Sequence, residues 1–474
     1  MTPNNENIAM ANIRIRRVAA AIALTTAGVL MTVARADLLI EHVNVISMIP
    51  QQAVQSDMHV LIRGERIVSI TRAAPQNLPA GIERIEARGR WLMPGLADMH
   101  VHLESDRLMR LYLNDPKVPR GTIRSADALL PYVANGVLQI AVLSSTPETI
   151  AQRDEVELGH VLGPHIALAA MIDGMPAVWP VGMTRVAANA SDGRQAVRDA
   201  AAEGYEFIKA YEQLDPETFV AICDEAHKLG MKVIGHLPDK ARGQTEKLFV
   251  PGFAMVAHAE EFAQQTSPPD PAQIPTYIRW ARDNGTWLTS TLTVDERIAQ
   301  MMMHPESLRQ RSELQYLPSQ IRRMAIEENR YVKGANPGWI EHTQRIIEFN
   351  RKLIVAFAAA GIPIVAGTDA QVPGVVPGFS LQDELQSLAQ AGLSNEQVLE
   401  SATRLPAEWL GTLEDRGTVA AGKRADLLLL EKNPLERIEN TRAITAVIVS
   451  GKAYSRGELD RRMAELRQRN AVEH

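Results

Sequence analysis

Two histidines separated by a single residue close an apolar stretch of the sequence. His100 and His102 lie in ADMHVHLE at 97–104, directly after the turn-like LMPGL at 92–96. On a β-strand, residues two apart point to the same face. Imidazole nitrogen is a ligand that zinc and related divalent metals prefer, and two imidazoles on one face can bind one ion. The pair therefore predicts a metal site at the end of this strand.

Further candidate ligands stand at or near the C-terminal ends of later strand-like segments. They are Lys209 in YEFIKAYEQ, His236 in KVIGHLP, His258 in MVAHAEEF and Asp369 in IPIVAGTDA. Taken singly, a strand-end histidine is more often a hydrogen-bonded structural residue. A lysine such as Lys209 is more often solvated or salt-bridged, and Asp369 could cap the following helix or turn. These separate interpretations do not explain why all of these residues stand at the ends of one series of strands. Their shared position favours a common site.

The elements that must position these residues alternate between strand and helix. Eight apolar segments between 95 and 370 are mostly separated by helical ones, such as DPETFVAICDEAHKLG at 215–230, with proline near its start and glycine at its end. This pattern predicts an α/β protein with a (β/α)8 TIM barrel, whose strand ends share the mouth where active sites form. A doubly wound sheet is the alternative, although no glycine-rich phosphate loop supports it.

Both ends of the chain show short alternating strands joined by glycine-containing turns. Examples are DLLIEHVNVISM at 37–48, DMHVLIRGERIVSITR at 57–72 and ITAVIVSGKAYSR at 444–456. Two β-rich pieces at opposite ends of a chain can fold together. We therefore predict a small β-sandwich domain built from 37–92 and from 411–474, which includes a C-terminal tail, beside a barrel at 93–410.

The composition is that of a globular protein, and it argues against one class of partner. The chain has 474 residues, of which 46% are hydrophobic and 22% charged, so a packed core is expected. A net charge of −6 without a basic stripe argues against a nucleic-acid partner. Cys223 is the only cysteine, which excludes an intrachain disulfide.

Residues 1–36 are typical of a signal peptide. The basic segment RIRRV at 14–18 opens an apolar run to Val33, and Ala34-Arg35-Ala36 matches a cleavage motif. The run is short for a membrane span. We therefore expect cleavage near Ala36, a periplasmic or secreted protein and no stable membrane anchor. Met10 is an alternative start that would give a more usual basic region.

The sequence resembles the amidohydrolase superfamily, and within it the imidazolonepropionase-like and Xaa-Pro dipeptidase-like branch. LMPGLADMHVH at 92–102 looks like the family's opening motif, and RGTVAAGKRADLLLLEKNPL at 416–435 looks like its closing segment. The resemblance covers nearly the whole mature chain. It implies a binuclear centre of two divalent ions at the barrel mouth, with zinc as the expected metal.

The resemblance also implies a role for each candidate. Four histidines match its ligands. His100 and His102 match the first-strand pair that binds the buried metal, and His236 and His258 match the ligands of the second metal. Lys209 matches a lysine that CO2 carboxylates, which turns a donor-only ammonium into a carboxylate that can bridge two ions. Asp369 matches the eighth-strand carboxylate, a metal ligand that orients the bridging hydroxide, takes its proton and delivers it to the leaving amine.

Candidate substrate contacts lie nearby. Tyr211, two residues beyond Lys209, is expected to face the mouth and could donate to a substrate carbonyl or carboxylate; packing under a loop is the alternative. The loop DGMPAVWPVGMTR at 173–185 offers Trp179 and Arg185, an apolar wall with a guanidinium that could pair with a free carboxylate. An ordinary loop tryptophan and a surface arginine are the other interpretation. The histidines without a strand-end position, interpreted as structural, are His160, His165 and His227.

These features predict an exported metal-dependent hydrolase that cleaves amide bonds of small peptides or N-acyl amino acids. Carbamates, ureas, lactones or phosphoesters are alternatives, since the same hydroxide attacks each of them. Imidazolone hydrolysis fits less well with an export signal, and the loop at 173–185 lacks the His/Gly-rich character of close prolidase-like relatives. A metal-binding protein without turnover would lack a ligand, and none is missing. The helical insert that includes 321–361 predicts a homo-oligomer contact.

Overall fold

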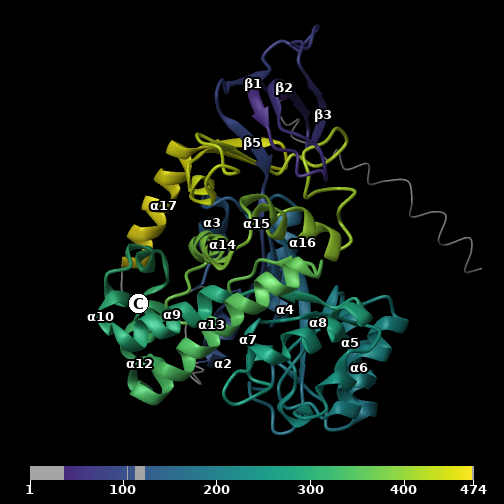
Figure 1. The fold of residues 1–474 in the computed structure, drawn as a ribbon. Helices are drawn as coiled ribbons and strands as arrows, with labels where there is room; N and C mark the ends of the chain where they lie inside the picture. The colour runs from purple at the N-terminus through teal and green to yellow at the C-terminus, as the bar shows by residue number, and fades with distance from the viewer. Residues whose placement is uncertain (1–36, 104, 113–122, 472–474) are drawn as a thin grey trace, which may run out of the picture.

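The protein was examined as a computed structural model that describes residues 37–103, 105–112 and 123–471. The predicted signal peptide at 1–36 lies outside the described residues. Within them, no helix combines the length and the apolar character that crossing a bilayer requires. Figure 1 shows a small sheet domain above a larger body of strands and surrounding helices.

Parallel strands form a barrel in the larger body. In sheet order they are β6 (Leu96–Val101), β7 (Val137–Val142), β8 (His165–Asp173), β10 (Phe207–Ala210), β11 (Lys232–Gly235), β12 (Phe253–Val256), β13 (Trp287–Thr289) and β14 (Ile364–Val365). The last strand meets the first, because Met99 N donates to Ala366 O at 2.9 Å and Val101 bridges Ala370 in parallel. The short β9 (Arg185–Val186) pairs with β8 outside this order. The predicted TIM barrel is therefore confirmed.

Helices surround the barrel strands. They are α2 (Asp106–Tyr112), α3 (Ser125–Ala134), α4 (Pro147–Glu157), α5 (Ala190–Glu203), α6 (Pro216–Lys228), α7 (Glu260–Ala263), α8 (Ile274–Asn284), α14 (Phe379–Ala391), α15 (Asn395–Ser401) and α16 (Arg404–Trp409). Helix α6 shows why they form: Asp215 caps the first turn by accepting from Thr218 N, and Pro216 opens the helix. Its buried face, which includes Phe219 and Ile222, packs toward the barrel.

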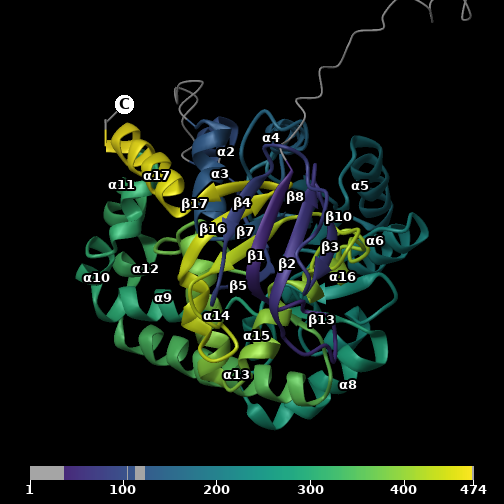
Figure 2. The ribbon, with the colours of Figure 1, turned by 90° about the horizontal axis from the view of Figure 1, so that it is seen from above.

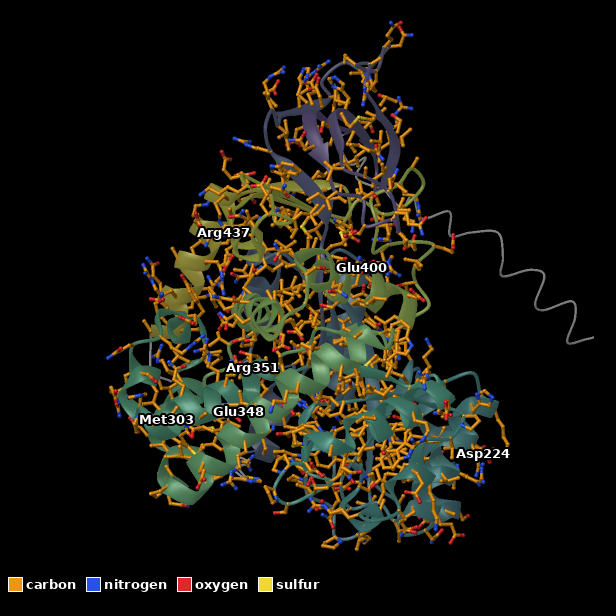
Figure 3. All side chains as sticks on the ribbon, in the orientation of Figure 1. Asp224, Met303, Glu348, Arg351, Glu400 and Arg437 are labelled. Atoms are coloured by element: carbon orange, nitrogen blue, oxygen red, sulfur yellow. The ribbon has the colours of Figure 1, made fainter. Side chains whose placement is uncertain are left out.

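A helical insert separates β13 from β14. It contains α9 (Leu292–Met303), α10 (Pro305–Arg309), α11 (Ser319–Glu327), α12 (Arg330–Gly334) and α13 (Pro337–Ala359). A core that includes Met301, Leu308 and Leu314 holds it together. Arg351 of α13, labelled in Figure 3, donates to Glu296 Oε1 of α9 at 2.7 Å. The insert forms one flank of the body (Figure 1).

The sheet domain combines both ends of the described chain. Its strands are β1 (Leu38–Val45), β2 (Gln55–Arg63), β3 (Arg66–Thr71), β4 (Glu83–Glu86), β5 (Trp91–Pro94), β15 (Leu427–Leu430), β16 (Ile444–Val449) and β17 (Lys452–Ser455). The order is β17-β16-β15-β5-β1-β2-β3, and N-terminal and C-terminal strands lie side by side in Figure 2. Gly451, directly before β17, lies so close to the β2–β3 turn that a Cβ on it would be 1.9 Å from Gly64 O. The terminal helix α17 (Arg456–Ala471) packs on α3.

Short 3-10 turns complete the described chain. They are η1 (Asp239–Ala241), η2 (Thr245–Leu248), η3 (Pro271–Gln273), η4 (Ser312–Tyr316) and η5 (Ile438–Arg442). His165, the first residue of β8, joins the barrel to the sheet domain. Its Nε2 lies 3.0 Å from Asp426 Oδ2, and its Nδ1 lies 2.7 Å from Glu157 Oε1. This buried position is consistent with the structural role predicted for His165.

Candidate metal centre

The six predicted ligands come from five different strands of the barrel. His100 and Lys209 lie within β6 and β10, and His236 directly follows β11. The others, which follow the ends of β6, β12 and β14, are His102, His258 and Asp369. All therefore stand at or just beyond the C-terminal ends of the barrel strands, the end where sites of this fold form.

Asp369 connects the first-strand histidines. Its Oδ1 lies 3.2 Å from His100 Nε2 and 2.9 Å from His102 Nε2. A ligand atom of His258 joins those of His100 and Asp369, all within 4.8 Å of one another. His236 completes the group, with its ring centroid 4.9 Å from that of His258. A divalent ion needs this kind of convergence of imidazole nitrogens and carboxylate oxygens.

The segment Gly367-Thr368-Asp369 is shaped to deliver the carboxylate. A Cβ on Gly367 would lie 2.5 Å from Thr289 Cγ2 and 2.9 Å from His100 Cβ, so only glycine fits this close approach. Asp369 itself has a φ of 52°, in the left-handed region that most residues avoid. Burial alone would raise the pKa of Asp369, but the two imidazoles outweigh it and hold the pKa well below its ordinary value.

Asp98 anchors that segment and was not singled out from the sequence. It is fully buried, and its carboxylate accepts hydrogen bonds from Thr368 N at 3.0 Å and from Thr368 Oγ1 at 2.7 Å. Burial raises the pKa of Asp98 to about 7. Asp98 precedes His100 by two residues, so the alternation that selected the histidine pair also contained the signal for Asp98.

Lys209 is the residue that most needs a chemical explanation. Its side chain is 1% exposed, and its Nζ has no hydrogen-bond partner among the described residues. Burial lowers the pKa of Lys209 to about 8, against an ordinary value of 10.5. An amine in this state is neutral more readily than an exposed lysine, and the neutral amine is the form that adds CO2. A buried, unpartnered Nζ beside histidine rings therefore fits a carboxylated lysine.

Three of the histidines are oriented through Nδ1. His102 Nδ1 lies 2.6 Å from Ser144 Oγ, and His258 Nδ1 lies 2.9 Å from Thr291 Oγ1. His100 Nδ1 lies 3.3 Å from Ala257 O. Each of these contacts uses Nδ1 and leaves Nε2 for another partner, which for His100 and His102 is Asp369 Oδ1. Proteins fix the ring and tautomer of metal-binding histidines by contacts of this kind.

His236 has a different environment, dominated by carboxylates. Its Nδ1 lies 2.8 Å from Glu261 Oε1 and 3.3 Å from Glu212 Oε1, in neither case with hydrogen-bond geometry. The other oxygen of Glu261 accepts from Leu237 N at 2.8 Å. Burial would lower the pKa of His236, but the carboxylates of Glu261 and Glu212 together outweigh burial and raise the pKa to about 9. The sequence carried a signal for Glu261, which follows His258 by three residues at the same strand end.

The predicted substrate contacts divide into two groups. The Tyr211 ring lies 4.4 Å from the His236 ring, and Trp179 packs against Tyr211 together with Met171 and Met183. Burial raises the pKa of Tyr211, so its hydroxyl stays protonated. These two aromatic side chains thus adjoin the ligand group.

Arg185 was predicted to pair with a free carboxylate of the substrate, but the structure directs its side chain to other partners. Its Nη2 pairs with Glu203 Oε2 at 2.7 Å, and its guanidinium lies 5.6 Å from the centre of the Tyr205 ring. Because Arg185 lies on β9, outside the barrel order, its side chain is committed to the neighbouring helix α5. The alternative interpretation of a surface arginine describes it better.

A guanidinium of the helical insert, that of Arg330, acts electrostatically on a carboxylate beside the site. Arg330 Nη2 of α12 donates to the Tyr331 hydroxyl at 2.9 Å. The charge of Arg330 helps to lower the pKa of Glu212, after the larger effect of His236. Burial raises the pKa of Tyr331, and Asp369 adds to that shift, while Arg330 opposes it. The sequence alone did not indicate that a charge on α12 would act on Glu212, whose Oε1 lies 3.3 Å from His236 Nδ1.

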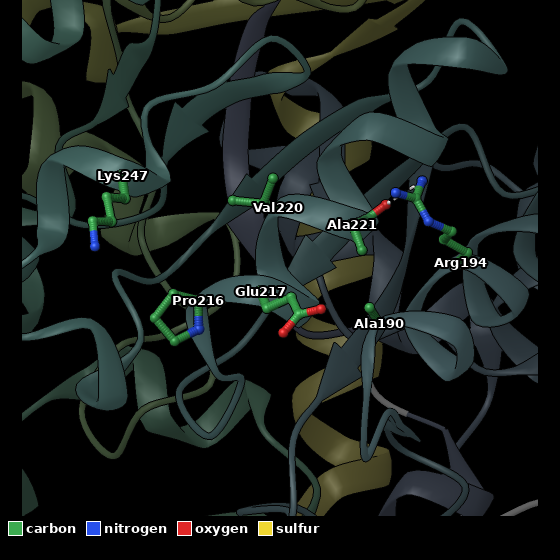
Figure 4. Close-up of a pocket in the computed structure, with 7 residues that line it drawn as sticks. All are labelled: Ala190, Arg194, Pro216, Glu217, Val220, Ala221 and Lys247. Carbon is green, nitrogen blue, oxygen red and sulfur yellow. Dashed lines mark hydrogen bonds between the residues drawn. The ribbon is translucent and has the colours of Figure 1, made fainter.

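A surface hollow between α5 and α6 is separate from this group (Figure 4). The described residues that line it are Ala190, Arg194, Pro216, Glu217, Val220, Ala221 and Lys247. None of these is a predicted ligand or substrate contact. The hollow therefore has no part in the candidate centre.

Comparison with known proteins gives the same architecture. Solved structures similar to the chain include a putative prolidase from Bifidobacterium longum, 21% identical, with 91% of this chain and 99% of that chain covered and a TM-score of 0.65. They also include bottromycin amidohydrolase, with 21% identity, coverage of 92% and 91% and a TM-score of 0.71. A. niger ochratoxinase has 18% identity, coverage of 89% and 96% and a TM-score of 0.64. At these identities the likeness shows a shared fold.

A curated relative and a family model extend the comparison to the sequence. An uncharacterized protein of Mycobacterium tuberculosis (strain ATCC 25618 / H37Rv) is 24% identical over 374 residues, which cover 77% of this chain and 86% of the relative. Residues 91–454 match the model of the amidohydrolase family. That match spans the whole barrel and the C-terminal strands of the sheet domain, so the chain belongs to the amidohydrolase family.

Proposed function

We propose that the protein is an exported, metal-dependent hydrolase of amide bonds in N-acyl amino acids or small peptides. The observation that carries the proposal is the buried Lys209 Nζ, unpartnered among the described residues, which interacts electrostatically with Asp369 and with three predicted ligands, His100, His236 and His258. A structural lysine would have an acceptor in such a place. Export rests on the N-terminal segment 1–36, and the insert α9–α13 offers a surface for a homo-oligomer contact.

The donor set fits two divalent ions, for which zinc is the expected metal. His100, His102 and Asp369 would hold one ion. His236 and His258 would hold the other, and a carboxylated Lys209 would be shared between them. Such ions supply Lewis acidity, which polarises the substrate carbonyl and acidifies water at the site.

Asp369 moves the proton in this proposal. Its pKa lies well below the ordinary value, so the carboxylate is ionised at neutral pH. Oδ1 is oriented by the imidazoles of His100 and His102 at 3.2 and 2.9 Å. From this position Asp369 accepts a proton from the attacking water and delivers it to the amide nitrogen, which must be protonated to leave.

Two groups at the mouth suit the rest of the substrate. Tyr211 is a protonated donor next to His236, so its hydroxyl can donate to a carbonyl oxygen. Arg330 supplies a guanidinium near Glu212, a group that pairs well with a free carboxylate. An acyl group joined to an amino acid contains both of these functions, which supports N-acyl amino acids as the substrate class.

A hydrolysis screen tests the proposal. The metal-replete protein without residues 1–36 would be given N-acyl amino acids and Xaa-Pro dipeptides, and release of the amine would be measured. We expect turnover of at least one of the two sets, abolished by Asp369→Asn and retained by the exposed control Asp239→Asn. Failure of every amide, with turnover of a lactone or phosphoester, would contradict the proposed bond class.

A further inference from the structure

The loop between β8 and β9 carries an unusual concentration of exposed apolar side chains. Met175 is 56% exposed, Val178 45% and Val181 78%. In the described parts of the chain only nine large hydrophobic side chains are exposed, and these three fall within seven residues. Single exposed hydrophobic residues are ordinary on protein surfaces, whereas grouped ones mark binding sites.

The same loop contributes a side chain to the surroundings of the candidate metal centre. Trp179 lies between Val178 and Val181 in the sequence and packs against Met171, Met183 and Tyr211. The Tyr211 ring in turn lies 4.4 Å from the ring of the predicted ligand His236. The loop that carries the exposed apolar side chains therefore also supplies an aromatic side chain to the cluster that contains Tyr211, next to His236.

The loop is held in this position by its backbone. Asp173, which is fully buried, accepts from Gly174 N and from Gln213 N with Oδ1, each at 2.8 Å, and from Val178 N with Oδ2 at 2.8 Å. A Cβ on Gly174 would lie 1.9 Å from Gln213 O, so the loop and the segment after Tyr211 are in direct contact. Lys240 Nζ donates to Met175 O at 3.0 Å. The first half of the loop, up to Val178, is thus held in place by hydrogen bonds.

Polar groups also surround the candidate centre, because Glu212 Oε1 lies 3.3 Å from His236 Nδ1 and the charge of Arg330 acts on Glu212. Arg330 and Glu212 come from the insert and from the segment after β10, and neither belongs to the apolar loop. A ligand that matched both parts would have a charged end and an apolar end.

We propose that the loop 174–184, with Trp179 and Tyr211, binds the apolar group of the substrate, so that the enzyme prefers N-acyl amino acids with an extended acyl chain. The inference rests on the proposed function and adds to it the chemical class of the acyl group. It assigns the exposed apolar side chains to substrate binding, and not to contact with a second copy of the chain or with a membrane.

The test is a series of one amino acid carrying acetyl, butyryl, hexanoyl, octanoyl and decanoyl groups. We expect kcat/KM to rise about two- to fourfold per added CH2, mainly through KM, because each buried methylene contributes at most about fourfold. The double variant Val178→Ser/Val181→Ser is expected to flatten this dependence. The matched control Val68→Ser/Leu229→Ser, which changes two exposed hydrophobic residues of the sheet domain and of the turn after α6, is expected to keep it.

Three outcomes overturn the inference. The first is kcat/KM that does not depend on chain length in the unsubstituted protein. The second is an equal dependence in the Val178→Ser/Val181→Ser variant. The third is dissociation of an oligomer by that variant without a change in chain-length dependence, which would assign the loop to a second copy.

Failure of the proposed function is distinguished by a binding measurement. If no N-acyl amino acid is hydrolysed, calorimetry with butyrate, hexanoate, octanoate and decanoate on the metal-replete protein decides the inference separately. Affinity that rises with chain length and falls in the Val178→Ser/Val181→Ser variant supports an apolar acyl site. Equal affinities, or no binding, overturn it.

Discussion

The hydroxyl oxygen of Thr291 lies 2.9 Å from Nδ1 of His258. Thr291 holds this position with a φ of 46°, a left-handed conformation that β-branched residues rarely adopt. Glu384 supports it from behind, because its carboxylate accepts from Leu292 N at 3.1 Å and from Thr293 N at 2.7 Å. A strained residue held by buried hydrogen bonds on both sides is typical of a functional site.

The Thr291 contact predicts a specific loss of metal affinity. Thr291→Val removes the hydroxyl and keeps the shape, so the His258 ring loses its orienting partner. We expect zinc affinity to fall about 10- to 100-fold, as for other partners of metal-binding histidines. Competition with a chromophoric chelator measures it. Thr291→Ser should retain the affinity, and unchanged affinity in Thr291→Val would show that the contact does not orient His258.

Asp369 is predicted to act on turnover more than on metal content. Asp369→Asn keeps an oxygen near His100 and His102 but cannot carry the proton to the leaving amine. We expect kcat to fall about 100- to 10,000-fold, the range ascribed to general acid–base catalysis. Metal analysis and steady-state kinetics on the same sample separate the two effects. A metal-replete Asp369→Asn protein with near-normal kcat would refute the proton-transfer role.

His165 gives the junction of the two domains a pH-dependent stability. Burial and the charge of Arg416 would lower the pKa of His165. Hydrogen bonds to Asp426 and Glu157 outweigh both effects and raise the pKa above its ordinary value of 6.5. A raised pKa in the folded state contributes stability below the unfolded value, and the contribution disappears as pH rises through the folded value. The partner Asp426, with its pKa lowered to about 2, is ionised throughout this range.

Urea unfolding at pH 6 and pH 9 measures this contribution. His165→Asn is expected to lower the free energy of unfolding more at pH 6 than at pH 9, because only the protonated imidazole donates to both carboxylates. His227→Asn, at an exposed position on α6, is the matched control and should show no such difference. An equal loss for His165→Asn at both values would mean that the junction does not depend on the imidazolium.

The sequence predicted the parts of the site that depend on strand geometry. His100 and Lys209 could be placed because a two-residue period fixes the face of a strand, and a barrel brings all strand ends to one mouth. The short alternating strands at both ends of the chain predicted the pairing of the termini in one sheet, because such strands are recognisable without knowing their partners.

Residues whose position depends on contacts between distant segments could not be predicted in this way. Thr291 lies 33 residues from its partner His258, and Arg330, whose charge acts on Glu212, belongs to an insert whose path follows no strand rule. Arg185 was assigned a substrate role from its loop, but the pairing of β9 with β8 turns it toward Glu203. Loop residues take their direction from tertiary contacts, which a local pattern does not contain.

The most direct test of the carboxylated-lysine centre is metal analysis of the purified mature protein beside its Lys209→Ala variant, with the exposed Lys247→Ala as control. The unsubstituted protein and Lys247→Ala are expected to bind about two divalent ions per chain. Lys209→Ala should bind about one or none, with partial recovery in short carboxylates. Full occupancy in Lys209→Ala, or no metal in the unsubstituted protein after reconstitution with zinc and bicarbonate, would contradict the proposed centre.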